Sequence, residues 1–437
     1  MDAGRIARSP DMSAPPPDAG LAAWLEYLER VHPASIELGL ERVAAVRDRL
    51  RLAPSFPIIT VGGTNGKGST CAMLESCLRA AGYRVGSYTS PHLLRYNERV
   101  RIAGMQASDE ALVGALQRVE HARGDISLTY FEFGTLAAMQ LFAQAGLDVA
   151  VLEVGLGGRL DAVNAFEPDC AVITSVGIDH TDYLGPTRED IGREKAGIFR
   201  AARPAVVAEP DPPAALLAHA QRIGAQLYLI DRDFGCAATE LQWQFWDWLG
   251  KRGGLPLPAL RGAYQLGNAS AALAALDTLK QQLAVDMGAI RRGLVQVELP
   301  GRFQVVPGAP VLILDVAHNP HAAVRLAENL AQLPRRGRTL AVFGMLRDKD
   351  IAGVIAAVSL EVDEWYIAPL AVSRGADLAR LHEAFAAAAV RSPVHTAPDV
   401  VRAIAKARGA AGANDRIIVF GSFYTVTDAL RSIQTTD

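Results

Sequence analysis

The glycine-rich segment Gly63-Thr64-Asn65-Gly66-Lys67-Gly68-Ser69 is the part of the sequence best suited to bind phosphate. The apolar residues 58–61 before it predict a strand, and helical spacing over 71–81 predicts a helix after it. Glycines let backbone N–H groups turn toward an anion, the helix N-terminus adds positive partial charge, and Lys67 can reach the outer phosphates. The segment therefore predicts a nucleoside triphosphate site.

Three residues that could bind a divalent cation, Ser90, Glu153 and His180, each follow an apolar run that predicts a strand. The runs are 83–89, 148–152 and 170–176. The carboxyl ends of parallel strands share one edge of a sheet with a phosphate loop. A lone carboxylate at a strand end is usually just solvated, but Glu153 downstream of such a loop has the form of the residue that ties Mg²⁺ to it. His180 lies between Asp179 and Asp182, a group suited to metal and phosphates.

A second Asp-His pair occurs in the segment Asp315-Val316-Ala317-His318-Asn319-Pro320, directly after the predicted strand 311–314. A lone histidine is usually satisfied by local hydrogen bonds. A matched polar strand end in each half of the chain instead suggests a site shared across an interdomain cleft. Lys195 lies in the predicted helix 188–199, where composition alone gives it no role beyond a solvated face.

The length of 437 residues predicts two domains. Alternating strands and helices predict an α/β fold, with a P-loop NTPase-like parallel sheet over 21–299 and a smaller Rossmann-like α/β domain over 300–437. Residues 1–20, rich in proline and small residues, predict a disordered leader. A long helix is expected over 264–283, and the tryptophans at 243–248 predict an aromatic hairpin or edge.

The composition argues against several classes of partner. A net charge of -3 with no dense Lys/Arg cluster gives no reason to expect nucleic acid or an anionic membrane. The longest uncharged apolar stretch, 133–147, is too short to span a bilayer. Four scattered cysteines without zinc spacing favour reduced thiols in a cytoplasmic protein. Small, multiply charged substrates remain compatible with this chain.

The sequence resembles the ATP-dependent ligases of the folylpolyglutamate synthase and dihydrofolate synthase family, within the Mur ligase superfamily. The matching segments span both predicted domains and include the family's own phosphate loop, with a glycine between Lys67 and Ser69. They are 63–69, 89–92, 96–99, 153–162, 179–181, 194–198, 300–303, 315–320 and 421–424.

The resemblance implies a role for each candidate residue. The 63–69 loop, Asn268, Arg302, Asp315 and His318 match ATP contacts, and Lys67, Lys195 and His318 are the expected catalytic residues. Ser90, Glu153 and His180 match Mg²⁺ ligands, and Lys195 matches a lysine that CO₂ converts to a carbamate able to help hold a metal. Asp161 and Ala162 match the lining of a pterin pocket, with residues 36–40 nearby; Val163 departs from the usual threonine.

The implied reaction joins L-glutamate to dihydropteroate, giving dihydrofolate, and to the γ-carboxyl of reduced folates, through an acyl phosphate. An enzyme with only the second activity is the first alternative. Cell-wall peptide ligases carry a whole extra domain before the phosphate loop, and the 61 residues before Gly62 are too few for one. A regulatory switch NTPase is weaker, because no Asn-Lys-x-Asp motif occurs. The resemblance suggests a monomer.

Overall fold

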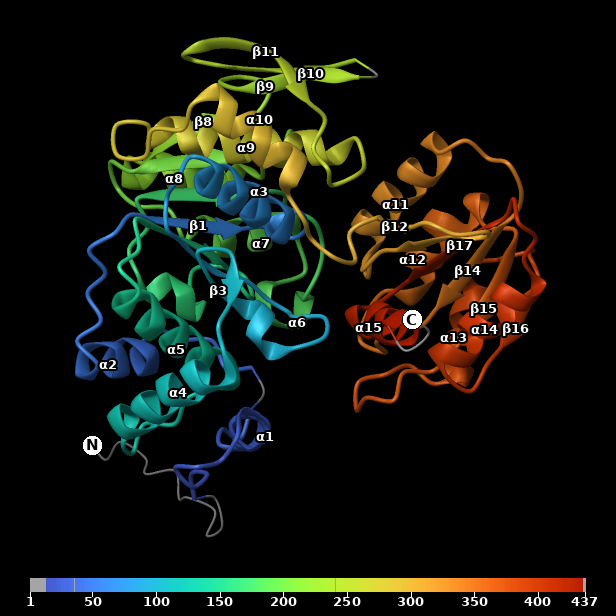
Figure 1. Cartoon of the computed structure of the whole chain (residues 1–437), viewed down its shortest axis with the longest axis horizontal. Helices are drawn as coiled ribbons and strands as arrows, with labels where there is room; N and C mark the ends of the chain where they lie inside the picture. The colour runs from blue at the N-terminus through green and yellow to red at the C-terminus, as the bar shows by residue number, and fades with distance from the viewer. Residues whose placement is uncertain (1–12, 35, 240, 435–437) are drawn as a thin grey trace.

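The computed structural model describes residues 13–34, 36–239 and 241–434. Two α/β units lie side by side, as Figure 1 shows, with the chain crossing once between them. The first contains an eight-stranded sheet with a small three-stranded sheet at one end, and the second contains a six-stranded sheet. The α/β fold class, with a parallel sheet first and a smaller α/β unit after it, is confirmed.

The first sheet places the phosphate loop at its centre, because the strand before the loop lies between two other parallel strands. The order is β4-β3-β2-β5-β1-β6-β7-β8, with β3 and β4 forming an antiparallel edge that the sequence did not predict. The fully buried β1 suits its apolar, β-branched sequence. The strands are β1 (Ile58–Gly62), β2 (Val85–Tyr88), β3 (Val100–Ile102), β4 (Met105–Gln106), β5 (Val149–Glu153), β6 (Cys170–Ile173), β7 (Pro204–Val207) and β8 (Gln226–Leu229).

Helices cover both faces of this sheet and bury a separate hydrophobic core on each. On one face lie α3 (Lys67–Ala80), α9 (Tyr264–Thr278) and α10 (Met287–Gln296). The other face is covered by α1 (Leu21–Arg30), α2 (Glu41–Arg49), α4 (Asp109–Arg123), α5 (Tyr130–Gln144), α6 (Thr181–Leu184), α7 (Arg188–Ala196) and α8 (Ala214–Ile223). The predicted helix over 264–283 is wrong at its end, since α9 stops at Thr278.

The tryptophan-rich segment forms the predicted hairpin. It comprises β10 (Gln242–Asp247) and β11 (Gly250–Pro256), with β9 (Gly235–Ala238) added on the other side of β10. Trp243 and Phe245 are buried against the face of the first unit that α9 covers. The hairpin therefore extends that core and does not approach the predicted site.

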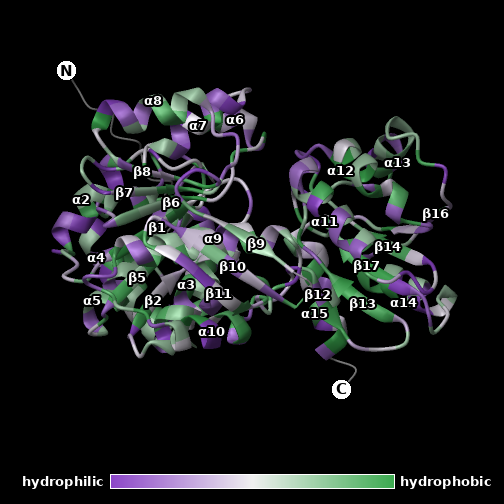
Figure 2. Cartoon of the chain, turned by 90° about the horizontal axis from the view of Figure 1, so that it is seen from above, coloured by the Kyte–Doolittle hydropathy of each residue, from purple (hydrophilic) through white to green (hydrophobic). Residues whose placement is uncertain are grey.

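The second unit has five parallel strands in the order β13-β17-β14-β15-β16, with β12 antiparallel at the edge beside β13. Figure 2 shows apolar residues concentrated in the strands and polar residues along the outer helices. The strands are β12 (Gln304–Val306), β13 (Val311–Leu314), β14 (Thr339–Phe343), β15 (Glu364–Ile367), β16 (Val394–Thr396) and β17 (Arg416–Phe420). The helices are α11 (Pro320–Gln332), α12 (Ile351–Val358), α13 (Leu378–Ala387), α14 (Val400–Ala410) and α15 (Phe423–Gln434).

The start of the described chain packs against the first unit. The Pro17 carbonyl accepts a hydrogen bond of 2.8 Å from Gln117 of α4, so order begins before residue 21. Residues 1–12 of the expected leader lie outside the described residues. None of the helices described is both long enough and apolar enough to cross a bilayer.

Candidate active site

A single cavity of about 1160 Å³ lies between the two units and brings together every candidate site residue. It is large enough for a nucleotide and a second ligand, since common ligand pockets occupy about 300 to 1,000 Å³. The candidates in its wall are Gly63, Thr64, Asn65, Gly66, Lys67, Gly68, Ser69, Ser90, Glu153, Asp161, Ala162, His180, Lys195, Asn268, Arg302, Asp315 and His318. Sites predicted from separate strand ends therefore form one continuous chamber.

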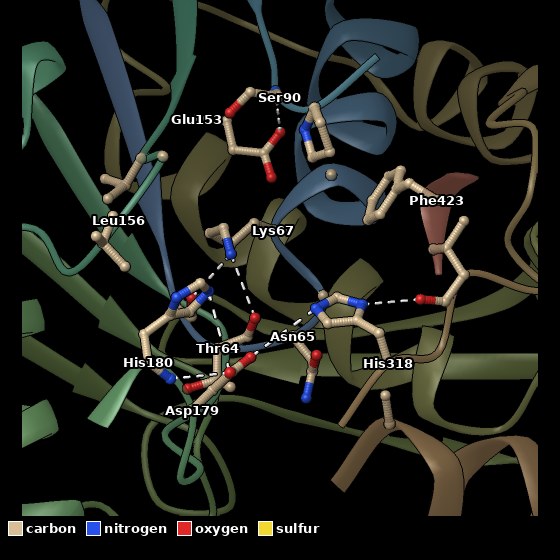
Figure 3. A pocket seen from close by; sticks show the side chains of 18 of the residues that line it. Thr64, Asn65, Lys67, Ser90, Glu153, Leu156, Asp179, His180, His318 and Phe423 are labelled. Atoms are coloured by element: carbon tan, nitrogen blue, oxygen red, sulfur yellow. Dashed lines mark hydrogen bonds and ion pairs between the residues drawn. The ribbon is translucent and has the colours of Figure 1, made fainter. Parts of the chain in front are cut away.

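The phosphate loop is held open by its glycines and by the lysine. Gly66 has a φ of +88°, and a Cβ there would lie 2.4 Å from the side-chain oxygen of Asn268, so only glycine fits. Lys67 is the first residue of α3, and its Nζ donates to the carbonyl oxygens of Gly63 and Thr64 at 3.0 and 3.2 Å (Figure 3). The loop thus presents a helix N-terminus and one cation to the cavity.

Ser90 and Glu153 lie together at the ends of neighbouring strands. The Ser90 N–H donates to a Glu153 carboxylate oxygen at 3.1 Å (Figure 3). Glu153 stands opposite Val61 in the sheet register, which fixes it beside the phosphate loop. Burial raises the pKa of the Glu153 carboxyl, and the charge of Lys67 opposes that rise.

Asp179 and His180 lie on the other side of Lys67 from Ser90 and Glu153 (Figure 3). They face the second unit. Lys349, which follows β14, donates to Asp179 at 2.6 Å and lies 3.3 Å from His180 Nε2. Burial opposes ionisation of Asp179, but the ion pair with Lys349 holds the pKa of its carboxyl below its usual range. Burial also lowers the pKa of His180 to about 4, so its ring is neutral. Sequence reasoning missed Lys349, which lies in a charged run typical of a solvated loop.

The second unit also contacts the phosphate loop itself. The side-chain amides of Asn65 and Asn319 exchange hydrogen bonds of 3.1 and 3.2 Å, and Asn319 donates to Asp179 at 3.1 Å. His318 Nδ1 bonds the Val316 carbonyl at 2.8 Å. Burial lowers the pKa of His318 to about 4, so the neutral ring carries its proton on Nδ1 and leaves Nε2 unprotonated.

Asp315 does not mirror Asp179 despite the matched sequence. Its buried carboxylate turns back into the second unit and accepts the backbone N–H groups of Phe303 and Ala317, both at 2.8 Å. Burial raises the pKa of the Asp315 carboxyl. Asp315 therefore fixes the backbone after residue 300, where the chain enters the second unit.

Lys195 of α7 is a buried amine, with 3% of its surface exposed. Burial lowers its pKa to about 7, and repulsion from Lys67 contributes to the shift. A substantial fraction of the side chain is therefore an uncharged amine near neutral pH. This form is a nucleophile, whereas an ordinary surface lysine is almost wholly protonated.

The far end of the cavity is built by the first unit alone. Asp161 is buried and accepts the N–H groups of Leu156 and Val163 at 2.8 and 3.0 Å. Burial nevertheless raises the pKa of its carboxyl to about 7. Ala162, Phe131 and residues 36–39 line the same end. Apolar walls around one carboxyl group suit a flat, partly polar ring system.

The central donors fit a magnesium-type ion held by few protein ligands. No group of three His, Cys, Asp or Glu residues placed to bind a metal occurs within the described part of the chain. Ser90 and Glu153 instead offer oxygen donors on one side of Lys67, and His180 offers an unprotonated nitrogen on the other. Mg²⁺ typically keeps several waters and takes phosphate oxygens together with one or two carboxylates.

Comparison with known proteins covers both units. A family model described as "Mur ligase middle domain" matches residues 61–276, and one described as "Mur ligase, glutamate ligase domain" matches 301–423. The "Dihydrofolate synthase/folylpolyglutamate synthase" of Escherichia coli (strain K12) is 49% identical over 98% of each chain. That of Haemophilus influenzae is 44% identical over 93% of this chain and 96% of its own.

Solved structures agree over almost the whole length. The Escherichia coli enzyme in complex with DHPP and ADP is 49% identical, with a TM-score of 0.92 over 97% of this chain and 99% of that chain. A bifunctional folylpolyglutamate synthase/dihydrofolate synthase with Mn, AMPPNP and L-glutamate bound is 50% identical, with a TM-score of 0.90 over 97% and 100%. With two-unit architecture, cavity and full-length similarity in agreement, the chain belongs to the dihydrofolate synthase/folylpolyglutamate synthase family of Mur ligases.

Proposed function

We propose that the chain is an ATP-dependent ligase that joins L-glutamate to dihydropteroate and to the γ-carboxyl of reduced folates. One observation carries this: a phosphate loop, oxygen donors for a cation and an apolar acceptor end share one cavity between two units. Relatives that are 49% and 44% identical carry the bifunctional name. The first alternative, a folylpolyglutamate synthase alone, is the name of a relative that is only 34% identical over 71% of this chain, so the more similar bifunctional relatives favour the proposal.

In the proposed reaction the acceptor carboxylate attacks the terminal phosphorus of ATP, and ADP leaves from an acyl phosphate. Lys67 and the N-terminus of α3 stabilise the negative charge on the transferring group. Asn65, Asn268 and Arg302 line the cavity beside the loop and would contact the nucleotide, and Asp315 would hold the backbone at Phe303 next to Arg302. Mg²⁺ would be held by Ser90 and Glu153 on one side of Lys67 and by His180 on the other, and would neutralise phosphate charge when bound.

Glutamate then attacks the acyl carbonyl through its neutral amine, and phosphate leaves as the amide forms. His318 is placed to take the proton that the amine loses, because its ring is neutral and its Nε2 is unprotonated. Water must be excluded at this stage, since it would hydrolyse the acyl phosphate. Asp161 and Ala162 would bind the pterin ring of the acceptor at the far end.

A carbamate on Lys195 is the second proposed feature of the site. The uncharged amine attacks CO₂, a nitrogen–carbon bond forms, one proton leaves to solvent, and a cation is replaced by an anion. The lowered pKa and the burial of Lys195 support this modification. Isotopically labelled bicarbonate should give a carbamate signal in the NMR spectrum of the wild type. Retention of that signal in Lys195→Ala would place the carbamate elsewhere.

The deciding experiment measures phosphate release with MgATP and L-glutamate, using dihydropteroate, tetrahydrofolate or no acceptor, and identifies the products by mass spectrometry. We expect amide products from both acceptors. Turnover with tetrahydrofolate alone would restrict the enzyme to folylpolyglutamate synthesis. Hydrolysis independent of any acceptor, without an amide product, would overturn the ligase assignment. The expected domain limits at 299/300, the monomeric state and the cytoplasmic location remain proposals.

A further inference from the structure

Arg99 is a cation in the cavity wall that the proposed mechanism does not use. It ends η1 (Tyr96–Arg99), the short turn between β2 and β3, and its carbonyl accepts the Thr89 N–H at 2.9 Å. This hydrogen bond ties Arg99 to the strand end that carries Ser90. Its side chain lines the same cavity as Ser90 and Glu153.

The Arg99 side chain is held in one orientation by three rings. Its guanidinium carbon lies 5.4 Å from the ring centroids of both Tyr96 and Tyr130. Its Nε donates to His92 Nδ1 at 2.9 Å. Across the described ranges, neither terminal nitrogen of Arg99 has a hydrogen-bond partner, and no carboxylate forms an ion pair with it.

Other cations in the cavity wall already have partners or roles. Lys349 pairs with Asp179, and Arg374 pairs with Asp348. Lys67 and Arg302 act on the nucleotide in the mechanism above. A fixed guanidinium without a carboxylate partner is suited to bind an anion, because its planar fork matches a carboxylate with two parallel hydrogen bonds.

The two acceptors differ by one carboxylate near the reacting group. Dihydropteroate carries a single carboxylate, which is the one that reacts. A reduced folate ends in glutamate and carries an α-carboxylate beside the reacting γ-carboxylate. Arg99 shares the chamber of the reacting group, since its side chain lines the same cavity as Lys67 and Ser90.

The position of Arg99 favours the acceptor over the incoming glutamate. It belongs to the first unit, and its partner Tyr130 lies between Thr129 and Phe131, which line the acceptor end. The family model for the second unit is described as the glutamate ligase domain. Building on the proposed function, we propose that Arg99 binds the α-carboxylate of the folate acceptor. It thereby supports folylpolyglutamate synthesis and leaves dihydrofolate synthesis without this contact.

The test compares both acceptors on one preparation of Arg99→Gln. Loss of a charge-assisted contact should raise the KM for tetrahydrofolate by about 10- to 100-fold, while kcat/KM for dihydropteroate stays within about threefold. Arg99→Lys should recover part of the tetrahydrofolate activity, because it restores the charge without the fork. Arg95→Gln is the matched control: Arg95 lies beside the same turn, pairs with Asp109 at 3.1 Å, and its side chain is 64% exposed.

A second measurement on the wild type alone does not depend on the folding of the variant: a tetrahydrofolate whose α-carboxylate is an amide should show the same rise in KM, about 10- to 100-fold. On Arg99→Gln, the KM values for the acid and for the amide should then be equal. Equal loss with both acceptors, a raised KM for glutamate, or equal use of acid and amide by the wild type would overturn the role of Arg99. Failure of the wild type with both acceptors would instead overturn the proposed function.

Discussion

The acceptor end and the centre of the cavity are built on different principles. The acceptor end, around Asp161, comes from the first unit alone, and backbone N–H groups bind its carboxyl group. The centre depends on contacts between the units, above all Lys349 with Asp179 and Asn319 with Asn65. The acceptor end is therefore preformed in one unit, whereas the centre is complete only when the two units adopt this arrangement.

The largest effect is expected from removing the cation of the phosphate loop. In Lys67→Met, kcat with either acceptor should fall by about 10³-fold or more, because charge on the transferring phosphoryl group loses its nearest stabilising side chain. Steady-state phosphate release measures this. Dihydropteroate binding, followed by fluorescence, should persist, because the acceptor end does not use Lys67. Loss of that binding would show that the acceptor end depends on the centre of the cavity.

Breaking the contact between the units should have the next largest effect. In Lys349→Met, Asp179 loses its ion-pair partner, and we expect kcat to fall about 10- to 100-fold while the acceptor KM changes little. Small-angle X-ray scattering should show a wider spread of unit orientations. Lys406→Met is the control, since Lys406 bonds the Thr396 carbonyl on the second unit's surface. An unchanged kcat would show that Lys349 does not contribute to catalysis.

A change confined to the acceptor end should affect acceptor binding alone. In Asp161→Asn, the side-chain NH₂ group is a donor, and it faces a backbone N–H group whose hydrogen bond the carboxylate accepts in the wild type. Loss of that hydrogen bond should raise the acceptor KM by about 5- to 100-fold, with the KM for ATP unchanged. Initial rates at varied acceptor and varied ATP separate the two. A matching rise in the KM for ATP would contradict a self-contained acceptor end.

The last prediction concerns the pH dependence of stability and not the rate of the reaction. The pKa of Asp161 is raised from its ordinary 3.8 to about 7. Its stabilising contribution is therefore complete below pH 3.8 and is lost as the pH rises through about 7. The stability advantage of the wild type over Asp161→Asn should shrink across that window, by at most about 1.4 kcal/mol per pH unit. Thermal unfolding of both proteins measures the trend, and a constant difference would show that Asp161 ionises normally.

The sequence predicted much of the site because local patterns marked it. Ser90, Glu153 and His180 each follow an apolar run, and parallel strands end at the same edge of a sheet, so the sequence alone predicted that these residues lie close together. Lys349 was missed because nothing local distinguishes a solvated lysine from one that crosses to another unit. Asp315 shows the converse: its sequence matches that of Asp179, yet its carboxylate binds its own backbone. The end of α9 at Thr278 was also missed, since alanine-rich spacing continues past it.

Lys67 has a second task in the phosphate loop besides its charge. Its ammonium group donates to the Gly63 and Thr64 carbonyls, so one side chain ties the first residues of the loop to the start of α3. The backbone that turns toward phosphate and the positive charge that a phosphate would meet therefore depend on the same residue, and neither can be altered by substitution without the other.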